Sequence, residues 1–432
     1  MYKGILGLVL WLSMLSGVLP YKLGTCCLTT LLIPYTFIVF SFTSLFITAN
    51  HVLLFIYKYD KSQSSLTMQI IQWCCNTVLI LVNAIGIFTA VKRLRHMDRS
   101  LKQLEKMKEK LTNMSIPRDR RTQFLVLISI LMTGATRGTD YFLFVFQHIK
   151  WFHNNTQITV HQCWMILVQM QTVAFAARVL LYLRAINDTL YKLTIEENLQ
   201  TKIIKEDRIV SNFAWEHSVT NTDAGRLRNV LPRYKSIPVN VASKVANTTT
   251  SGLNQDESVV YTIRRISECY NIVLNIVRKT SDVDGKLIIV IIFCHMLYSE
   301  LNLFRFIVWV TGEERVTIVT MYILVHSILH ALALLVLVDP FHRTHAEMER
   351  TSLLVQSLKF RCKDHQPLYN ELELFQRHLL MDKTTYSPLG MCTLDRSLVL
   401  NIFGTLISYL VIITTYGAPV DSPLLFMLSK EA

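Results

Sequence analysis

Seven mostly apolar stretches, each long enough to cross a lipid bilayer, restrict the fold of this chain more than any other feature. They cover about residues 31–57, 67–91, 122–148, 161–185, 286–310, 316–338 and 397–416. A helix needs roughly 20 apolar residues to span the hydrocarbon core. With 51% hydrophobic and only 17% charged residues, the chain is too apolar for an ordinary soluble enzyme. The predicted fold class is all-α, a polytopic membrane protein with seven transmembrane helices.

The lysines and arginines predict the orientation, because basic loops stay in the cytosol. With the N-terminus inside, 34 of the 44 basic residues are cytosolic, and the outer segments hold 5. Around the third span, residues 92–121 carry 11 basic residues and the following outer loop carries one. We therefore expect a cytosolic N-terminus and an extracellular C-terminus. The net charge of +13 reflects this bias, helped by anionic lipid, and needs no nucleic-acid partner.

Two local signals bear on this topology. Residues 4–19 imitate a signal peptide, but Pro20 closes the apolar run and no small-x-small cleavage site follows cleanly, so we expect a helix at the membrane surface. The glycosylation sequon at Asn154 falls on a predicted outer loop. Those at Asn113, Asn187 and Asn247 fall inside and would be silent. The cysteines show no CxxC spacing, and neither a metal nor a cofactor is predicted.

Three cytosolic segments contain apolar residues at helical spacing, which predicts a cytosolic platform of amphipathic helices. The three stripes are Leu94, Met97, Leu101, Leu104 and Leu111; Ile263, Ile266, Tyr270, Val273 and Val277; and Tyr369, Leu372, Phe375 and Leu379. The alternative for the first is a solvated linker. Residues 216–258 are rich in Asn, Thr, Ser and Pro without periodicity, and we expect them to be disordered.

The last span carries a polar stripe. At 100° per residue, an arc of about 80° contains Ser397, Asn401, Thr405, Ser408, Ile412 and Thr415. A polar stripe in a membrane helix faces a partner or water, although such hydroxyls also bond their own backbone or pack between helices. The single large apolar residue, Ile412, favours a hydrated path with a dewetting gate. A pore lined by one helix per chain implies a symmetric oligomer.

Residues 390–416, GMCTLDRSLVLNIFGTLISYLVIITTY, resemble the C-terminal signature of insect gustatory receptors. In that signature an LDRS-like segment leads into a last span that ends in TY, five hydrophobic residues, and QF or QL. Ser408 and Tyr409 match TY, and Thr415 and Tyr416 stand where the family has QF. The shorter Thr415 puts conductance or gating in question. Residues 16–24, SGVLPYKLG, resemble the family's start, and residues 184–190, RAINDTL, its turn after the fourth span.

The resemblance implies a ligand-gated, non-selective cation channel in the plasma membrane of chemosensory neurons, and not an enzyme. Its partners would be a small-molecule tastant, sugar or bitter, membrane lipid, and related receptors in a homo- or hetero-tetramer. The pore-lining residues would be Thr405, Ser408, Ile412 and Thr415. The implied organisation begins with an N-terminal cytosolic or interfacial segment (1–30), followed by transmembrane helices 1 and 2 (31–91), a basic cytosolic loop (92–121) and transmembrane helices 3 and 4 (122–185). A long, partly disordered cytosolic loop (186–285) leads to transmembrane helices 5 and 6 (286–338). Cytosolic anchor helices (339–396), the pore-lining helix 7 (397–416) and an extracellular tail (417–432) complete the chain.

Ligand-binding candidates are the polar or aromatic residues in the outer halves of the spans, because amides, carboxylates and flat rings suit a sugar and rings suit an apolar bitter compound. They are Trp73, Asp140, Gln169, Glu300 and Tyr322. Each could instead form an interhelical hydrogen bond or an interface anchor. We also expect Arg305 to pair with Glu300 or Asp140.

Three other classes of membrane protein share some of these features. A G-protein-coupled receptor has seven spans but places its N-terminus outside. A transporter can also line its cavity with polar stripes, although no duplicated halves are visible. A membrane di-iron oxidase needs more ligands than His326, His330, His342 and His345 provide.

Overall fold

The computed structural model describes residues 5–15, 66–110, 152–211, 252–311, 318–363, 365–382 and 385–416, with scattered positions in 38–49 and 120–138. All regular secondary structure in these residues is helical, which confirms the all-α class for this part of the chain. The helices are α1 (Ile5–Leu15), α3 (Leu66–Lys110), α5 (Phe152–Ser211), α7 (Gly252–Thr311), α8 (Ile318–Arg361), α9 (Gln366–Met381), the short 3-10 helix η2 (Pro388–Gly390) and α10 (Arg396–Tyr416).

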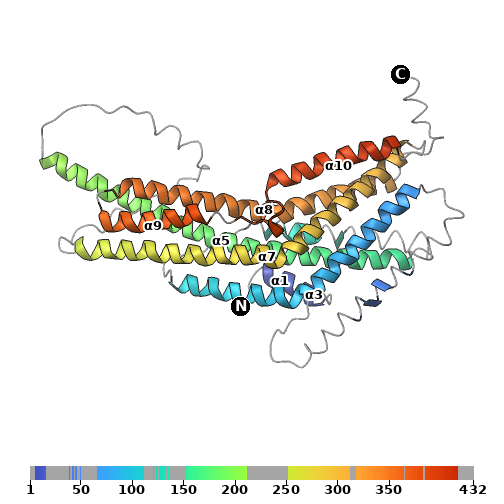
Figure 1. The fold of residues 1–432 in the computed structure, drawn as a ribbon, viewed down its shortest axis with the longest axis horizontal. Coiled ribbons are helices and arrows are strands. Elements are labelled where there is room, and N and C mark those ends of the chain that lie inside the picture. Colours follow the sequence, from blue (N-terminus) through green and yellow to red (C-terminus); the bar gives the residue numbers. More distant parts are fainter. Residues whose placement is uncertain are drawn as a thin grey trace, which may run out of the picture.

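Four helices are much longer than a bilayer is thick. α3, α5, α7 and α8 have 45, 60, 60 and 44 residues. At 1.5 Å per residue they are about 65–90 Å long, whereas the hydrocarbon core measures about 30 Å. They run along the long axis of the molecule, and α9 lies beside their polar ends (Figure 1). Each long helix therefore combines an apolar part that can cross a membrane with a polar part that projects beyond it.

Four of the predicted spans lie on helices that are long and apolar enough to cross a membrane. These helices are Ile70–Glu109, His161–Ile195, Val259–Ile307 and Ile323–Arg361, and they carry the predicted spans 67–91, 161–185, 286–310 and 316–338. The last predicted span, 397–416, lies on α10, which has 21 residues. Most of the predicted spans 31–57 and 122–148 lies outside the described residues. The count of seven spans and the orientation of the termini therefore stay predictions.

Most residues of the predicted amphipathic stripes are buried, whereas Leu101 and Tyr369 are partly buried. Leu94, Met97 and Leu104 of α3 are in the core, as are all five residues of the second stripe and, on α9, Leu372, Phe375 and Leu379. α9 packs against α7 and α8. These segments are therefore helices with one packed side, and the linker alternative for residues 92–110 is wrong. Leu111 lies outside the described residues.

Residues 184–190 do not form the turn that the resemblance implied. They lie within α5, which continues without a break to Ser211. The helix continues because its packed side does not end there: Ala185, Ile186 and Leu190 are buried. Asn154, which was expected on an outer loop, lies in the first turn of α5. The stretch 216–258 was expected to be disordered, but α7 begins inside it, at Gly252.

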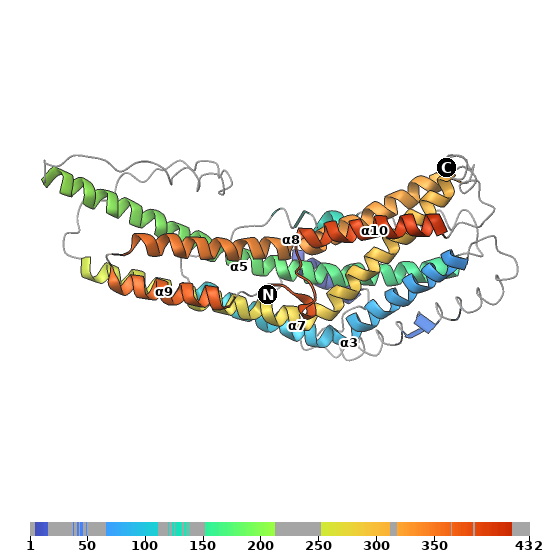
Figure 2. The ribbon, with the colours of Figure 1, turned by 45° about the horizontal axis from the view of Figure 1, so that its top comes forward.

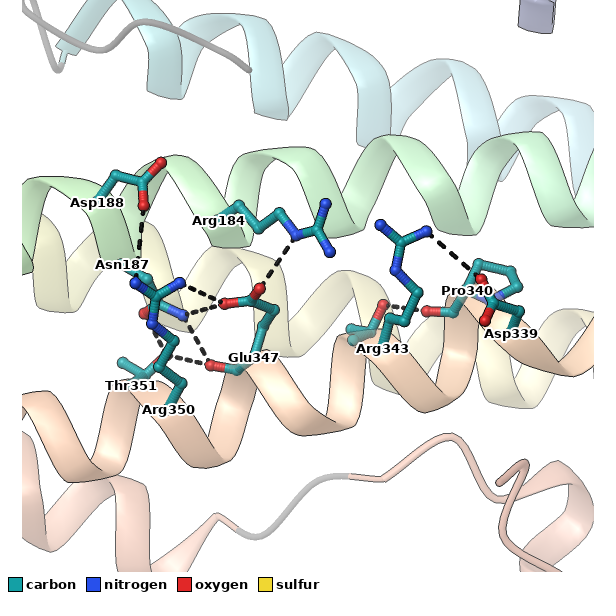
Figure 3. A network of polar contacts seen from close by, with 10 residues as sticks. Arg184, Asn187, Asp188, Asp339, Pro340, Arg343, Glu347, Arg350 and Thr351 are labelled. Atoms are coloured by element: carbon teal, nitrogen blue, oxygen red, sulfur yellow. Dashed lines mark hydrogen bonds and ion pairs between the residues drawn. The ribbon is translucent and has the colours of Figure 1, made fainter. Parts of the chain in front are cut away.

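Polar residues also join α5 to α8 where the helices leave their apolar parts (Figure 3). Glu347 of α8 accepts hydrogen bonds from Arg184 Nε and Asn187 Nδ2, each at 3.0 Å. Thr351 donates its hydroxyl to Asn187 Oδ1 at 2.7 Å. Because Asn187 is fully buried, these bonds provide partners that water cannot. They explain why a polar sequence continues as a packed helix.

A second polar contact joins three helices. Arg93 of α3 donates from Nε to Asp284 of α7 at 2.8 Å and from Nη2 to the Thr172 hydroxyl of α5 at 2.9 Å. Next to Asp284, α7 has no side chain at Gly285, and a Cβ there would lie 3.3 Å from the Pro388 Cα. The glycine therefore lets η2 pack directly on α7, just before the chain enters α10.

The N-terminal helix α1 packs against α5. Its residues Leu6, Val9 and Leu10 are buried in the main core, whereas Leu8 and Trp11 are exposed. A helix is thus present within residues 4–19, as expected. Its location at the membrane surface stays a prediction.

Candidate pore helix and ligand site

α10 begins with a well-defined N-cap. The Asp395 carboxylate accepts hydrogen bonds from the Ser397 hydroxyl at 2.7 Å and from the Leu398 backbone N–H at 2.9 Å. These hydrogen bonds, the one from Ser397 above all, hold the pKa of Asp395 below its usual value. The cap satisfies a backbone donor that a helix start otherwise leaves unpaired. It fixes the residue at which the helix begins.

The first residue of α10 is tied to α8. Arg396 Nη2 lies 3.1 Å from Asp339 Oδ1, and Asp339 also receives Arg343 Nη1 at 3.4 Å. Asp339 directly precedes Pro340, the proline inside α8. One carboxylate thus holds both the base of α10 and the following turn of α8.

One side of α10 packs on the bundle and the other side is open. Val399, Ile402 and Leu406 are buried, and the last two form a small apolar cluster with Leu334 of α8. In Figure 1, α10 lies along the upper edge of the bundle, beside α8 and α7. The residues of the predicted polar stripe are exposed: Ser397, Asn401, Thr405, Ser408, Ile412 and Thr415. At 100° per residue, the centre of the stripe is about 140° from the packed side.

The hydroxyls of the stripe bond the backbone of their own helix. Thr405 donates to the Asn401 carbonyl at 2.9 Å, Ser408 to the Gly404 carbonyl at 3.0 Å, and Thr415 to the Val411 carbonyl at 2.7 Å. The local bonding therefore occurs, and these exposed hydroxyls do not pack between the described helices of the same chain. Each hydroxyl oxygen can still accept a hydrogen bond from water or an ion's hydration shell. The side of α10 that carries the stripe can line a hydrated path.

A buried group of polar side chains lies between the helices in the apolar half. We call it the outer polar cluster; it consists of Asn76, Gln169, His295, Tyr298 and His330. Gln169 Oε1 lies 2.7 Å from His295 Nε2, and Gln169 Nε2 donates to the Ala333 carbonyl at 2.7 Å. His295 Nδ1 lies 3.0 Å from His330 Nδ1. Tyr298 stacks on the His330 ring and donates to Asn76 Oδ1 at 3.1 Å.

The structure brings only part of the predicted ligand set together. Gln169 is in the outer polar cluster, and exposed Trp73 lies one turn before Asn76 on α3. Glu300 is buried on α7, but the hydrogen bonds of the cluster do not include it among the described residues. Tyr322 is on α8 with its side chain outside the described part of the chain, and Asp140 lies wholly outside it. Arg305 donates to Gln72 rather than to Glu300, so the expected pairing with Glu300 is wrong, and the alternative pairing with Asp140 stays a prediction.

Sequence reasoning missed four members of this cluster: Asn76, His295, Tyr298 and His330. His330 had been considered only as an iron ligand, because it follows His326 by four residues. In the described residues, no three His, Cys, Asp or Glu side chains gather as a metal site. The available signal was the presence of polar residues in several apolar spans, which in membrane helices face one another or a cavity.

The comparisons with known proteins agree with this architecture. A family model described as "7tm Chemosensory receptor" matches residues 6–417. The chain belongs to this family of seven-transmembrane chemosensory receptors, and its resemblance to insect chemoreceptors is confirmed at the family level. It is similar to the solved insect olfactory receptor OR5 from Machilis hrabei, with a TM-score of 0.54, 9% identity, and coverage of 94% of this chain and 96% of that chain. At this identity the likeness shows the fold alone. No curated protein matches.

Proposed function

We propose that this receptor is a gustatory receptor that acts as a ligand-gated, non-selective cation channel in the plasma membrane. The observation that carries the proposal is the open side of α10, where Thr405, Ser408 and Thr415 are turned away from the chain's own bundle. Water and hydrated cations suit such a surface, whereas lipid does not. Four copies, identical or mixed with related receptors, would place their α10 helices around a central pore. The number four rests on the resemblance to gustatory receptors.

The apolar residues beside the stripe support an assembly of several chains. Leu400, Ile407 and Val411 are exposed on α10 next to the hydroxyls. A neighbouring α10 packed on these residues would leave the polar stripe facing the central axis. Among the stripe residues, Ile412 is the large apolar one, and a ring of isoleucines can close a narrow pore by excluding water. Thr415, in the place of the family's Gln, would line the pore beyond this ring.

The proposed ligand is a small-molecule tastant, a sugar or a bitter compound. The amide, imidazole and phenol groups of the outer polar cluster provide the donors and acceptors that a polar ligand requires. Trp73, Asp140, Glu300 and Tyr322 remain proposed neighbours of this site. The cluster also lies close to the pore helix, because Leu334, one turn after His330, packs on Ile402 and Leu406. A ligand that moves His330 would therefore act on the packed side of α10.

Whole-cell current from cells that express this chain, challenged with sugars and bitter compounds, tests the proposal. We expect a ligand-evoked cation current, and a constitutive leak in Ile412→Ala. Ile407→Ala is the matched control, since both isoleucines are exposed (50% and 61%) but Ile407 lies off the stripe. Equal leak in both variants, or no current despite surface expression of the chain with and without a related receptor, would contradict the proposal.

A further inference from the structure

α3 changes from exposed apolar to exposed basic residues on a single side. Leu81 and Phe88 are exposed, and at 100° per residue they share an arc of about 60° with Lys92, Arg95 and Arg99, which are exposed as well. The apolar side chains belong in contact with lipid acyl chains, because they precede the end of the predicted span at residue 91. The three basic side chains that follow on the same side then lie at the depth of the lipid headgroups.

α7 shows the same change at the same level. Its exposed Phe293 shares an arc of about 40° with exposed Lys286 and Lys279. The two helices are antiparallel, and the contacts Arg93 to Asp284 and His96 to Thr280 fix their register. Position 92 on α3 therefore faces the level of position 286 on α7, so both helices become basic at one depth.

The basic residues lie on one side of the helix pair and are not neutralised there. Burial lowers the pKa of His96, which lies between α3 and α7; Asp284 opposes this shift, and the charges of Lys279 and Arg99 add to it. Within the described residues, none of Lys92, Arg95, Arg99, Lys279 and Lys286 forms an ion pair, whereas Lys102 is held by Asp98 and Arg278 by Asp382. Asp282 is exposed between the two lysines of α7, so these five basic residues and this carboxylate carry a net charge of +4.

We infer that these five residues, the α3–α7 basic patch, bind the headgroups of anionic phospholipids. The exposed Phe88 and Phe293 adjoin the basic patch on the same sides of α3 and α7, which favours a lipid over a soluble polyanion. A lipid would contact the apolar residues with its acyl chains and the basic residues with its headgroup. In the predicted topology, with the N-terminus in the cytosol, the patch faces the inner leaflet, where anionic lipids are concentrated. The general excess of cytosolic basic residues requires charge in these segments, but it does not require charge on this one side or at this one depth.

Native mass spectrometry of the purified full-length receptor tests this inference without any measurement of current, so its result is separate from that of the channel proposal. The probe is dioctanoyl phosphatidylinositol bisphosphate, and dioctanoyl phosphatidylcholine serves as the neutral reference. We expect the wild-type receptor to retain the anionic lipid at concentrations where the neutral one dissociates. Substitution of Lys92, Arg95 and Arg99 by Gln should weaken the apparent affinity at least tenfold.

The matched control is Lys106→Gln with Lys108→Gln and Lys110→Gln, which removes the same charge from the same helix. Its first position lies about 10 Å below Arg99, the nearest patch residue of α3, and this distance exceeds the Debye length of about 8 Å at physiological ionic strength. The control should change the affinity less than twofold, and Lys279→Gln with Lys286→Gln should reproduce the loss from the other helix. Equal losses in the patch and control variants, or equal retention of the two lipids by the wild-type receptor, would overturn the inference.

Discussion

Arg93 and Asp284 form a buried ion pair with a nitrogen–oxygen distance of 2.8 Å, and each side chain is only 2% exposed. The pair connects α3 to α7 at the level where α3 leaves its apolar part. Removal of one partner leaves an unpaired buried charge, so we expect Asp284→Leu to lower the free energy of unfolding by about 3–5 kcal/mol. Chemical unfolding of the purified receptor, followed by tryptophan fluorescence, measures this change.

The double variant Arg93→Met with Asp284→Leu should recover most of the lost stability, because no buried charge remains. The exposed pair between Arg278 and Asp382 provides the control, with side chains 52% and 50% exposed. Asp382→Ala should cost no more than about 1 kcal/mol. A double variant as unstable as Asp284→Leu alone would show that packing, and not charge pairing, explains the effect.

Cysteine accessibility tests which side of α10 lines the pore. Thr405→Cys and Ser408→Cys should be modified by a charged, water-soluble thiol reagent applied during ligand exposure, with progressive loss of current. Leu400→Cys, also exposed in the single chain but off the stripe, should be covered by a neighbouring chain and react slowly. The wild-type receptor gives the background from its own cysteines. Rapid block of Leu400→Cys with protection of Ser408→Cys would assign the pore to a different side of α10.

The N-cap of α10 should contribute measurably to stability. Asp395→Ala removes the acceptor for the Ser397 hydroxyl and the Leu398 N–H and should cost about 0.5–2 kcal/mol, whereas Asp395→Asn should retain most of the cap. Because the pKa of Asp395 is lower in the folded than in the unfolded state, its contribution is complete above the ordinary carboxyl value of 3.8 and is lost as the pH falls through the folded-state pKa. The unfolding transition as a function of pH, compared between wild type and Asp395→Asn, detects this dependence.

Gln169 should affect the ligand response more than the pore. Gln169→Leu removes the acceptor of His295 and the donor to the Ala333 carbonyl, so the outer polar cluster loses its link between α5, α7 and α8. We expect the ligand concentration for half-maximal current to rise at least tenfold. The double variant Gln169→Leu with Ile412→Ala distinguishes this from misfolding, because a folded channel should still leak. Loss of the leak would show that Gln169 is needed for assembly.

Glycosylation provides a test of orientation. We expect Asn154→Gln to remove a glycan and Asn187→Gln to leave the electrophoretic mobility unchanged, because the sequon at Asn187 is cytosolic in the proposed topology. Asn187 is also fully buried against Glu347, which excludes a glycan from the folded chain. Digestion with a glycosidase before electrophoresis measures both. A G-protein-coupled receptor topology would place the two ends of α5 on the opposite sides of the membrane and leave Asn154 unmodified.

Local periodicity predicted the elements that pack through apolar stripes. The stripe that includes Ile263 and Ile266 and the one that includes Phe375 are both buried, because a helix with one apolar side can stabilise itself only by covering that side. For the α10 stripe, periodicity predicted one polar side but left open whether that side faces water or a partner, or packs between helices.

Contacts between residues far apart in the sequence could not be predicted in this way. Nothing local indicates that Asn187 meets Glu347 160 residues later, and without that contact residues 184–190 look like a place for a helix to end. The same holds for Gln169 and His295, which are 126 residues apart. The pairing of α5 with α7 and α8 gives these polar residues their partners, and only the three-dimensional fold determines that pairing.

The level of Arg93 and Asp284 divides the long helices into two arms. α7 extends 32 residues before Asp284 and 27 after it, which correspond to about 48 Å and 40 Å. In Figure 2, η2 and the start of α10 lie near the middle of this helix. In mechanical terms, if α7 moves as a rigid rod, the level of Asp284 is a fulcrum, and the two parts of α7 on either side of it are arms of nearly equal length. His295, in the proposed ligand site, lies 11 residues, or about 17 Å, from Asp284 on α7. A rigid tilt of α7 that begins there would therefore be larger at its polar end, and the pore helix begins beside the point that moves least.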